Sequence, residues 1–407
     1  MARPALIMGL DIGTTKICSV IGEMSSNGVH IVGVGEMPSS GLRKGVVVNI
    51  ERTVQSIQGA LEEAELMSGC EVRSVYVGIA GSHIKGFGSH GAVAIKNGEV
   101  SKADMERAME AATAVAIPLD REVIHALPQE YIVDGQRGIV DPLGLAGVRL
   151  EMHAHIITGA VNSAKNIVAC CHRSGLEVVD IVLEALASAK AVLTREEREL
   201  GVVLVDIGGG TTDVVFLRNN AIRYAGALPL GGQNLTNDIA FGLRTPMGSA
   251  ERIKIKYGCA LKGLVNSNDM IEIPSVGGRE PWAMPRHLLT EICQPRMEEI
   301  LSRVNQELTQ SGHKNFAAAG VVLTGGAALM KGCQDLGEEI FKLPTRVGFP
   351  RNIGGLHEVV NSPKYATAVG LVCYGAEKED RDKHTKPSKN IFERVLEDMK
   401  SWVKDIS

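Results

Sequence analysis

Apolar and polar positions along the first third of the chain predict short strands separated by glycine turns. Apolar residues dominate three successive segments, 7–13, 16–24 and 30–37, and a fourth strand of the same kind is expected at 72–81. Between them, residues 50–67 repeat their apolar positions with a period near 3.6, which predicts an amphipathic helix. Buried strands alternating with helices are typical of an α/β protein.

The pattern changes at about residue 82 and changes back at about residue 152. Residues 83–151 contain short strand-like runs, one helix-like run and loop signals at Asp134-Gly135 and Asp141-Pro142. We therefore expect a small inserted α+β unit at 83–151. A first domain would consist of residues 1–82 and 152–195, and a second domain of residues 196–375.

A strand, a glycine turn and a second strand occur twice, about half the chain apart. LDIGTTK at 10–16 and VDIGGGTTD at 205–213 each place Asp at the end of a buried strand, followed by glycine and two threonines. An internal repeat of this kind predicts two duplicated domains. A third glycine turn, in VVLTGGAAL at 321–329, also follows a hydrophobic strand.

Turns rich in glycine and threonine present backbone N–H groups and hydroxyls in one direction, which suits phosphate oxygens. Two such turns facing each other could hold a polyphosphate from both sides. Asp11 and Asp206 would then hold the waters of a Mg²⁺ ion, which favours a hydrated oxygen shell. Lys16 could pair with phosphate, and the third turn would let a base or ribose approach the backbone. Any one turn alone is equally compatible with an ordinary hairpin.

Composition narrows the class of protein without identifying it. The 407 residues are 44% hydrophobic, and their net charge of −4 gives no general attraction to nucleic acid, so we expect no nucleic-acid partner. No apolar run reaches 18 residues, so no membrane-spanning helix is expected. Eight cysteines without a Cys-x-x-Cys spacing indicate reduced thiols in the cytoplasm. His153 and His155 are expected to be surface or hydrogen-bonded residues and not zinc ligands.

The paired turns resemble the ATPase fold shared by actin, Hsp70 chaperones and sugar kinases. Within that superfamily the chain is similar to the FtsA family of bacterial cell-division proteins, through both turns and the segments 228–240, 250–258 and 273–281. The resemblance covers residues 6–376 and resumes at the C-terminus. It implies two duplicated domains around a nucleotide cleft and an SHS2-like inserted subdomain, with residues 232–305 as an outer subdomain of the second domain.

The resemblance also implies a site for ATP and Mg²⁺. The nucleotide-binding positions would be Asp11, Gly13, Thr14, Thr15, Lys16, Asp206, Gly208, Gly209, Gly210, Thr211, Asp213, Glu251, Lys254, Gly325, Gly326 and Ala327. Asp11 and Asp206 would hold Mg²⁺ through water. Glu184 would orient the attacking water, although the helix dipole alone also favours an acid at a helix N-terminus. Hydrolysis would be weak at most, with the nucleotide serving mainly as a ligand for structure and assembly.

The C-terminal residues carry a separate prediction. Residues 376–390 contain nine charged residues and one apolar residue, which predicts a disordered linker. In residues 391–407 the apolar side chains share an arc of about 140° on a helix; they are Ile391, Phe392, Val395, Leu396, Met399, Trp402, Val403 and Ile406. A lone helix of this length is marginal in water and needs a surface, for which a membrane interface is suited. The alternative is a helix docked on the protein itself or on a partner helix.

Taken together, the resemblance implies a peripheral membrane protein on the cytoplasmic face of the bacterial inner membrane at midcell. It would anchor FtsZ filaments, which form the Z ring at the septum, by binding the FtsZ C-terminal peptide through the second domain. It would recruit later divisome proteins through the inserted subdomain and form filaments or oligomers with itself. Two alternatives are an actin-like pilus-assembly ATPase module and a phosphotransferase of the sugar-kinase type; for the latter, only Glu184 offers a catalytic base.

Overall fold

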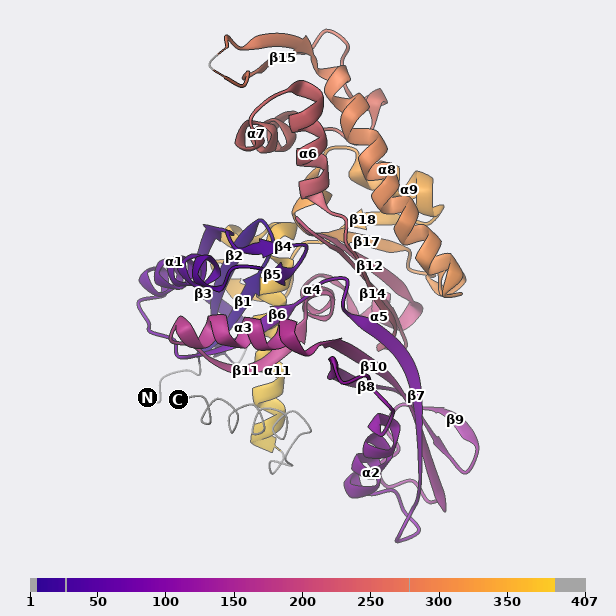
Figure 1. Ribbon diagram of the computed structural model, residues 1–407. Coiled ribbons are helices and arrows are strands. Elements are labelled where there is room, and N and C mark those ends of the chain that lie inside the picture. The colour runs from indigo at the N-terminus through magenta and orange to yellow at the C-terminus, as the bar shows by residue number, and fades with distance from the viewer. Residues whose placement is uncertain (1–5, 26–27, 278, 385–407) are drawn as a thin grey trace.

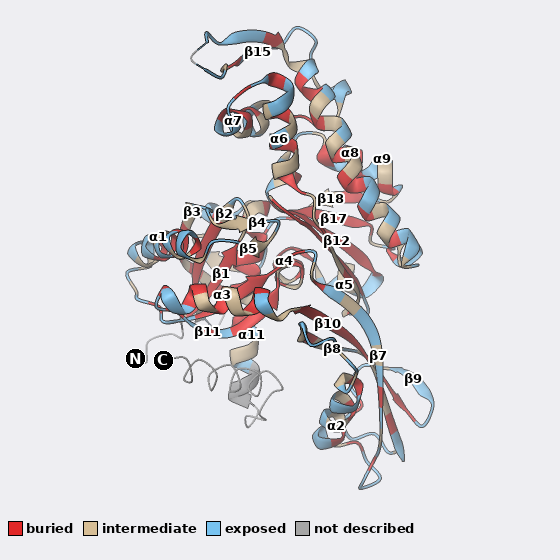
Figure 2. Ribbon diagram, in the orientation of Figure 1, coloured by how far each residue is buried: buried red, intermediate tan, exposed pale blue. Residues whose placement is uncertain are grey.

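The computed structural model describes residues 6–25, 28–277 and 279–384. Figure 1 shows two large domains side by side, with a smaller unit extending from one end and a helical region from the other. Buried apolar residues form three clusters. One fills the first domain and continues onto the sheet of the second domain, one lies within the second domain, and one lies in the smaller unit; Figure 2 shows them within the sheets and on the inner faces of the helices.

The first domain is built on a six-stranded sheet in the order β11-β6-β1-β2-β3-β19. Its strands are β1 (Leu6–Ile12), β2 (Lys16–Ser25), β3 (Gly28–Pro38), β6 (Ser74–Ile79), β11 (Glu177–Leu183) and β19 (Ile353–Gly355), with the small ribbon of β4 (Leu42–Arg43) and β5 (Val46–Val47) beside them. Its helices are α1 (Ile50–Ser68), α3 (Val161–Arg173), α4 (Glu184–Val192), α10 (His357–Val360) and α11 (Ala366–His384). The helix expected at 50–67 is thus confirmed as α1. Asn49 caps its first turn and Gly69, with φ of 66°, ends it.

The second domain repeats the strand pairing of the first. Its sheet has the order β14-β13-β12-β17-β18, formed by β12 (Val202–Ile207), β13 (Thr212–Arg218), β14 (Ala221–Leu228), β17 (Val321–Thr324) and β18 (Thr345–Val347). Strand β12 is antiparallel to β13 and parallel to β17, just as β1 is antiparallel to β2 and parallel to β6. The register sets Asp11 opposite Cys18 and Asp206 opposite Asp213. The predicted duplication is therefore present in the topology.

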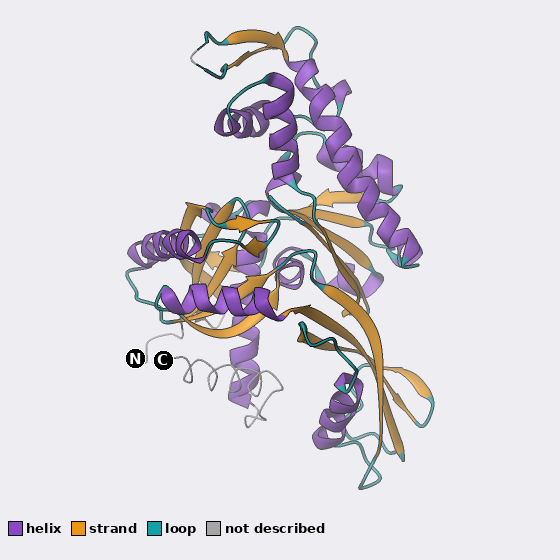
Figure 3. Cartoon of the chain, in the orientation of Figure 1, coloured by secondary structure: helices purple, strands orange, loops and turns teal. Residues whose placement is uncertain are grey.

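Helices surround the second sheet and extend beyond it. They are α5 (Arg195–Leu200), α6 (Gly232–Leu243), α7 (Met247–Tyr257), α8 (Arg286–Gln310) and α9 (Cys333–Phe341), with short 3-10 turns at η1 (Lys262–Leu264), η2 (Lys314–Phe316), η3 (Gly326–Leu329) and η4 (Pro363–Tyr365). A two-stranded ribbon of β15 (Met270–Ile273) and β16 (Trp282–Pro285) projects from the outer part (Figure 3). Helix α6 starts at the glycine turn after β12, where the backbone N–H groups of Gly232 and Gln233 donate to the carbonyls of Gly208 and Gly209, so the outer part lies beside that turn.

The inserted unit is a four-stranded antiparallel sheet in the order β7-β10-β8-β9, covered on one face by α2 (Lys102–Thr113). Its strands are β7 (Lys85–Ala94), β8 (Arg121–Val133), β9 (Gln136–Ile139) and β10 (Arg149–Ala160). The predicted end of the unit at residue 151 falls inside β10, which pairs with β7 and β8 along nearly its whole length. Alternation identified the strand but does not encode which sheet a strand joins.

Helix α11 continues to His384, so the predicted start of a disordered linker at residue 376 is wrong. Charges that look like linker composition are paired in the fold. Lys378 forms an ion pair with Asp180 at 2.6 Å, and Glu377 forms one with Lys190. The predicted membrane helix at 391–407 lies outside the described residues. Within the described residues, no helix has both the length and the hydropathy needed to cross a bilayer.

Candidate functional site

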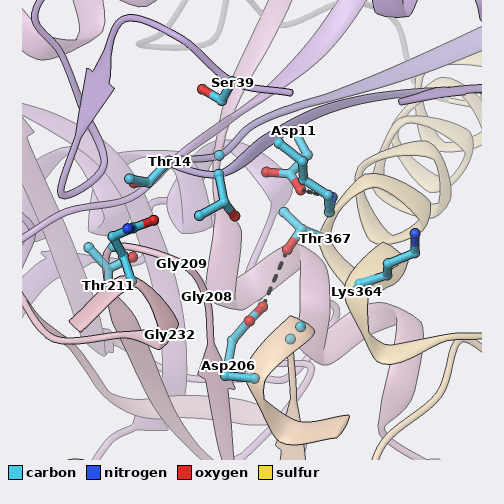
Figure 4. A pocket seen from close by; sticks show the side chains of 18 of the residues that line it. Asp11, Thr14, Ser39, Asp206, Gly208, Gly209, Thr211, Gly232, Lys364 and Thr367 are labelled. Carbon is cyan, nitrogen blue, oxygen red and sulfur yellow. Dashed lines mark hydrogen bonds and ion pairs between the residues drawn. The ribbon is translucent and has the colours of Figure 1, made fainter. Parts of the chain in front are cut away.

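A cleft of about 800 Å³ opens between the two large domains. All seventeen residues that the sequence indicated for this site line it, from both repeated turns, the third turn, α4 and α7. Figure 4 shows the turn after β1 and the turn after β12 approaching the same space from opposite sides. The structure therefore brings together residues that lie more than 300 positions apart in the chain.

The two glycine turns pack directly against each other. A Cβ atom on Gly209 would lie 2.4 Å from the side chain of Thr15, and one on Gly210 would lie 2.4 Å from Thr14 Oγ1. The hydroxyl of Thr14 in turn accepts a hydrogen bond from the backbone N–H of Gly45 at 3.0 Å. Because real Cβ atoms do not approach other atoms so closely, the contact requires glycine at both positions.

In the first domain, the β1–β2 turn holds an ion pair at one wall of the cleft. Asp11 is the next-to-last residue of β1, Lys16 begins β2, and Lys16 Nζ lies 3.0 Å from Asp11 Oδ2. Removal from water opposes the charge on Lys16, but the nearby Asp11 carboxylate outweighs it and holds the pKa of the amine above its usual range. The cleft thus contains a fully charged ammonium group placed by a strand end.

In the second domain, two carboxylates face each other across the β12–β13 pair. Asp206 Oδ2 accepts hydrogen bonds from Ser188 at 2.6 Å and from Thr367 at 3.3 Å, and Asp213 Oδ2 accepts one from Thr211 at 3.0 Å. Burial and the charge of Asp11 raise the pKa of Asp206 to about 6, although the hydrogen bonds from Ser188 and Thr367 act in the opposite direction. Burial and the charge of Asp206 raise the pKa of Asp213 to about 7. Among the described residues, Asp213 Oδ1 is buried without a hydrogen-bond partner.

Glu184 is the first residue of α4 and points toward this group of acids. It packs against Gly78 of β6, where a Cβ atom would lie 2.8 Å from Glu184 Cγ. Desolvation, together with the charges of Asp11, Asp213 and Asp206, holds the pKa of Glu184 well above its usual range. This surrounding favours the protonated form of Glu184 when no cation offsets the neighbouring charges.

The far end of the cleft is organised by Lys254 of α7. Its Nζ donates to Glu251 Oε2 at 2.8 Å, to Thr236 Oγ1 at 2.9 Å and to the Gly232 carbonyl at 3.1 Å. These bonds tie α7 to the first turns of α6. The third turn packs closely against Asp206. Gly325 of this turn has φ of 85°, and a Cβ atom there would lie 2.4 Å from Asp206 Oδ1.

Several cleft residues were not found by sequence reasoning. Thr367, Lys364 and Glu36 line the cleft, and Ser188 is buried behind its wall, where it holds Asp206 together with Thr367. Lys364 forms an ion pair with Glu36 at 2.9 Å where η4 meets β3. Ser188 could have been found from the sequence, because it follows Glu184 by four residues and therefore lies on the same face of α4. Thr367 and Lys364 follow no recognisable motif, and only the fold brings them to the site.

The histidine and cysteine candidates remain apart from this cleft. His153 Nδ1 lies 3.4 Å from Glu130 in the inserted unit, whereas His155 is buried and its pKa falls to about 4 because of desolvation and the nearby His313. Cys170 and Cys171 are buried in α3. Across the described part of the chain, no cluster of three or more His, Cys, Asp or Glu residues has the geometry to hold a metal ion by itself.

Comparisons with known proteins agree with this architecture. Residues 203–370 match the family described as "Cell division protein FtsA", and residues 81–158 match "SHS2 domain inserted in FTSA". The second range includes most of β10, in agreement with the corrected extent of the inserted unit. A protein from Pseudomonas aeruginosa named "Cell division protein FtsA" is 50% identical over 405 residues, which cover 98% of this chain and 97% of that protein.

Solved structures of lower identity share the fold. A structure titled "PilM-PilN type IV pilus biogenesis complex" matches with a TM-score of 0.66 at 17% identity, covering 91% of this chain and 98% of that chain. MreB 5 of Spiroplasma citri bound to AMPPNP matches with a TM-score of 0.55 at 15% identity, covering 94% and 100%. These likenesses establish an actin-like α/β fold. Together with the identity to the Pseudomonas protein over nearly the whole of both chains, they show that this chain belongs to the FtsA family of cell division proteins.

Proposed function

We propose that the cleft binds ATP together with Mg²⁺. The observation that carries the proposal is the contact between the two glycine turns, which brings glycine and threonine residues of both domains to the wall of one cleft. Turns of this composition suit phosphate oxygens. Lys16 supplies a positive charge beside that space. The relative bound to AMPPNP supports a nucleotide in a cleft of this fold.

The acids of the cleft fit a hydrated Mg²⁺ ion. Besides burial, the charge of Asp11 raises the pKa values of Asp206, Asp213 and Glu184, so a divalent cation would relieve the repulsion among these groups. Mg²⁺ commonly keeps several waters and takes few protein carboxylates, which agrees with a site that lacks a complete cage of protein ligands. Asp11 and Asp206 would hold the ion through its waters.

Weak hydrolysis follows from the environment of Glu184. Glu184 is placed to orient a water, but burial and the neighbouring carboxylates raise its pKa and so disfavour the charged form that would accept a proton, until a cation offsets those charges. Turnover is therefore slow, and the nucleotide acts mainly as a ligand that joins the two domains. In this proposal the nucleotide serves assembly of the protein, whereas in a phosphotransferase it would be consumed as a substrate.

Nucleotide binding can be tested with a fluorescent ATP analogue in Mg²⁺ buffer. Wild-type protein should bind it, and Asp206→Asn should bind with a strongly increased Kd because it removes one of the two carboxylates assigned to the ion. Asp120→Asn, at an exposed turn of the inserted unit, is the matched control and should bind as wild type does. Equal binding by Asp206→Asn and the control would contradict the site.

At the cellular level, we propose that the protein anchors FtsZ filaments to the cytoplasmic face of the inner membrane at midcell. Family membership supports this role over that of a pilus-assembly module, whose structure is alike in fold at 17% identity. The lipid contact would come from the apolar stripe of residues 391–407. Removing these residues should leave nucleotide binding intact and abolish sedimentation with liposomes. Trp402→Glu should reproduce the loss, whereas Ser401→Glu, on the polar side of the same helix, should not.

The protein partners are assigned to separate regions. The FtsZ C-terminal peptide would bind the outer part of the second domain, where Phe241, Met270 and Trp282 are exposed. Later divisome proteins would bind the inserted subdomain, which exposes Val140 and Val148. Self-association into filaments or oligomers would follow nucleotide binding. Phe241→Glu should weaken binding of an FtsZ peptide, with Val140→Glu as the control, and sedimentation with and without ATP tests assembly.

A further inference from the structure

We propose that Ser188 and Thr367 are positioning residues, which fix the Asp206 carboxylate so that one oxygen is held by the protein and the other is presented to a divalent cation. The inference rests on the proposed function of the cleft and adds to it how the cation site is set. It assigns a role to two hydroxyl residues that belong to none of the three glycine turns.

Three side chains from three elements form the arrangement. Ser188 of α4 is fully buried, and its Oγ lies 2.6 Å from Asp206 Oδ2 and 2.9 Å from Thr367 Oγ1. Thr367 Oγ1, in the first turn of α11, lies 3.3 Å from the same carboxylate oxygen. A hydroxyl has one proton to donate and two lone pairs to accept with. Ser188 therefore donates to Asp206 at the short distance, while Thr367 can donate to Asp206 or to Ser188.

The other oxygen of Asp206 faces a gap that glycine keeps open. A Cβ on Gly325 would lie 2.4 Å from Asp206 Oδ1, so any side chain there would cover this oxygen. Gly325 also has φ of 85°, a conformation that glycine favours. Asp206 Oδ2 is thus occupied by two hydroxyl groups, whereas Oδ1 faces the cleft.

Without the hydroxyl groups of Ser188 and Thr367, charge repulsion would favour rotation of the Asp206 carboxylate. Asp11 lines the same cleft and Asp213 lies opposite Asp206 on the neighbouring strand, and the negative charges of these carboxylates repel that of Asp206. Two hydrogen bonds to one anionic oxygen oppose that rotation, because bonds to a charged acceptor are stronger than neutral ones. Ser188 and Thr367, the two anchors of the carboxylate, therefore act through Asp206 and do not themselves touch the cation.

The anchors are rigid because their helices cross in contact. At the crossing of α4 and α11, a Cβ on Gly370 would lie 1.9 Å from the carbonyl oxygen of Ala187, the residue before Ser188. Glu184 lies one turn before Ser188 on the same helix. A single helix thus sets both the Asp206 carboxylate and the proposed water-orienting group.

The test is the Mg²⁺ dependence of nucleotide binding in the full chain. Ser188→Ala and Thr367→Val should each require roughly 10- to 100-fold more Mg²⁺ for half-maximal binding of the fluorescent ATP analogue, the range found when a partner of a metal ligand is removed. Their affinity measured in excess EDTA should equal that of wild type. Thr367→Ser keeps the hydroxyl and should restore the wild-type Mg²⁺ requirement.

Two controls separate positioning from the general cost of losing a buried hydroxyl. Ser19 and Thr290 are fully buried, and within the described part of the chain their hydroxyls have no partner. Ser19→Ala and Thr290→Val should leave the Mg²⁺ requirement unchanged. If one of the two anchor variants fails to fold, the other still decides the matter.

The outcomes are distinct. An unchanged Mg²⁺ requirement in the anchor variants, or an equal loss of affinity with Mg²⁺ and with EDTA, would overturn the positioning role while leaving nucleotide binding standing. If the wild-type protein binds no nucleotide in either buffer, the proposed function itself fails. A raised Mg²⁺ requirement in Thr367→Val that Thr367→Ser reverses would support the inference.

Discussion

The crossing of α4 and α11 offers a sharp test of how the cleft is built. Replacing Gly370 with alanine adds one methyl group, and its carbon would lie 1.9 Å from the Ala187 carbonyl oxygen and 2.3 Å from the carbonyl carbon. Both atoms belong to the backbone of α4, so no side-chain rotation can relieve the contact. The two helices themselves must move apart.

The magnitude follows from that distance. An ordinary contact begins at 3.4 Å, so the helices must separate by roughly 1.5 Å to accept the methyl group, and overpacking of this kind typically costs about 1–3 kcal/mol. Alanine itself favours a helix over glycine by about 0.5–1 kcal/mol. The steric term outweighs the helix preference, and we expect a net loss of about 1–2 kcal/mol in the free energy of unfolding.

Urea unfolding followed by circular dichroism measures the change, with Gly248→Ala as the matched control. Gly248 lies in α7 with nothing within 4 Å of a Cβ, so alanine there should raise the unfolding midpoint slightly. Gly370→Ala should lower it, and should also raise the Mg²⁺ requirement for nucleotide because Ser188 moves with Ala187. A midpoint that rises in both variants would show that the helices do not touch as described.

Three further predictions concern other parts of the molecule. His125 is buried with a pKa lowered to about 4, chiefly by desolvation, so the unfolded chain binds the proton first as pH falls below about 6.5. Stability should therefore decrease from pH 7 to pH 5, by on the order of 2 kcal/mol from this group, and His125→Gln should flatten the dependence in urea titrations. Arg346 pairs through two nitrogens with Glu197 at 2.7 Å, so Arg346→Ala should cost about 1–3 kcal/mol, and Arg346→Lys should not restore it in the same assay. Gly210→Ala should force Thr14 away and weaken binding of the ATP analogue at least about tenfold, or 1.4 kcal/mol; wild-type affinity in fluorescence titration would contradict the contact between the turns.

Local sequence was sufficient for the repeated turns because their chemistry is contained in a few adjacent residues. Asp11 and Asp206 are each the next-to-last residue of a buried strand, and glycine must follow where two turns meet without room for Cβ atoms. The same reasoning placed α1 within one residue of its observed end. Features of this kind are set by backbone geometry and by hydrophobic period, both of which can be read in sequence.

Tertiary pairing explains what sequence reasoning missed. Strand β10 alternates like a strand of the first domain, yet it pairs with β7 and β8, and no local pattern records that choice. Residues 376–384 have the composition of a linker, but Lys378 is paired with Asp180 and the helix continues. Thr367 is an ordinary helix residue until the fold brings it to Asp206, 161 positions away.

Helix α11 joins the cleft to the point where the described chain ends. Thr367, in its first turn, contacts Asp206, and eleven residues later Lys378 is paired with Asp180 of β11. Eleven residues of α-helix span about 16 Å, and glycines within this stretch do not loosen it, since Gly370 packs against Ala187. Helix α11 thus joins a contact with Asp206 in the cleft to the ion pair with Asp180, and both contacts are made by one continuous element.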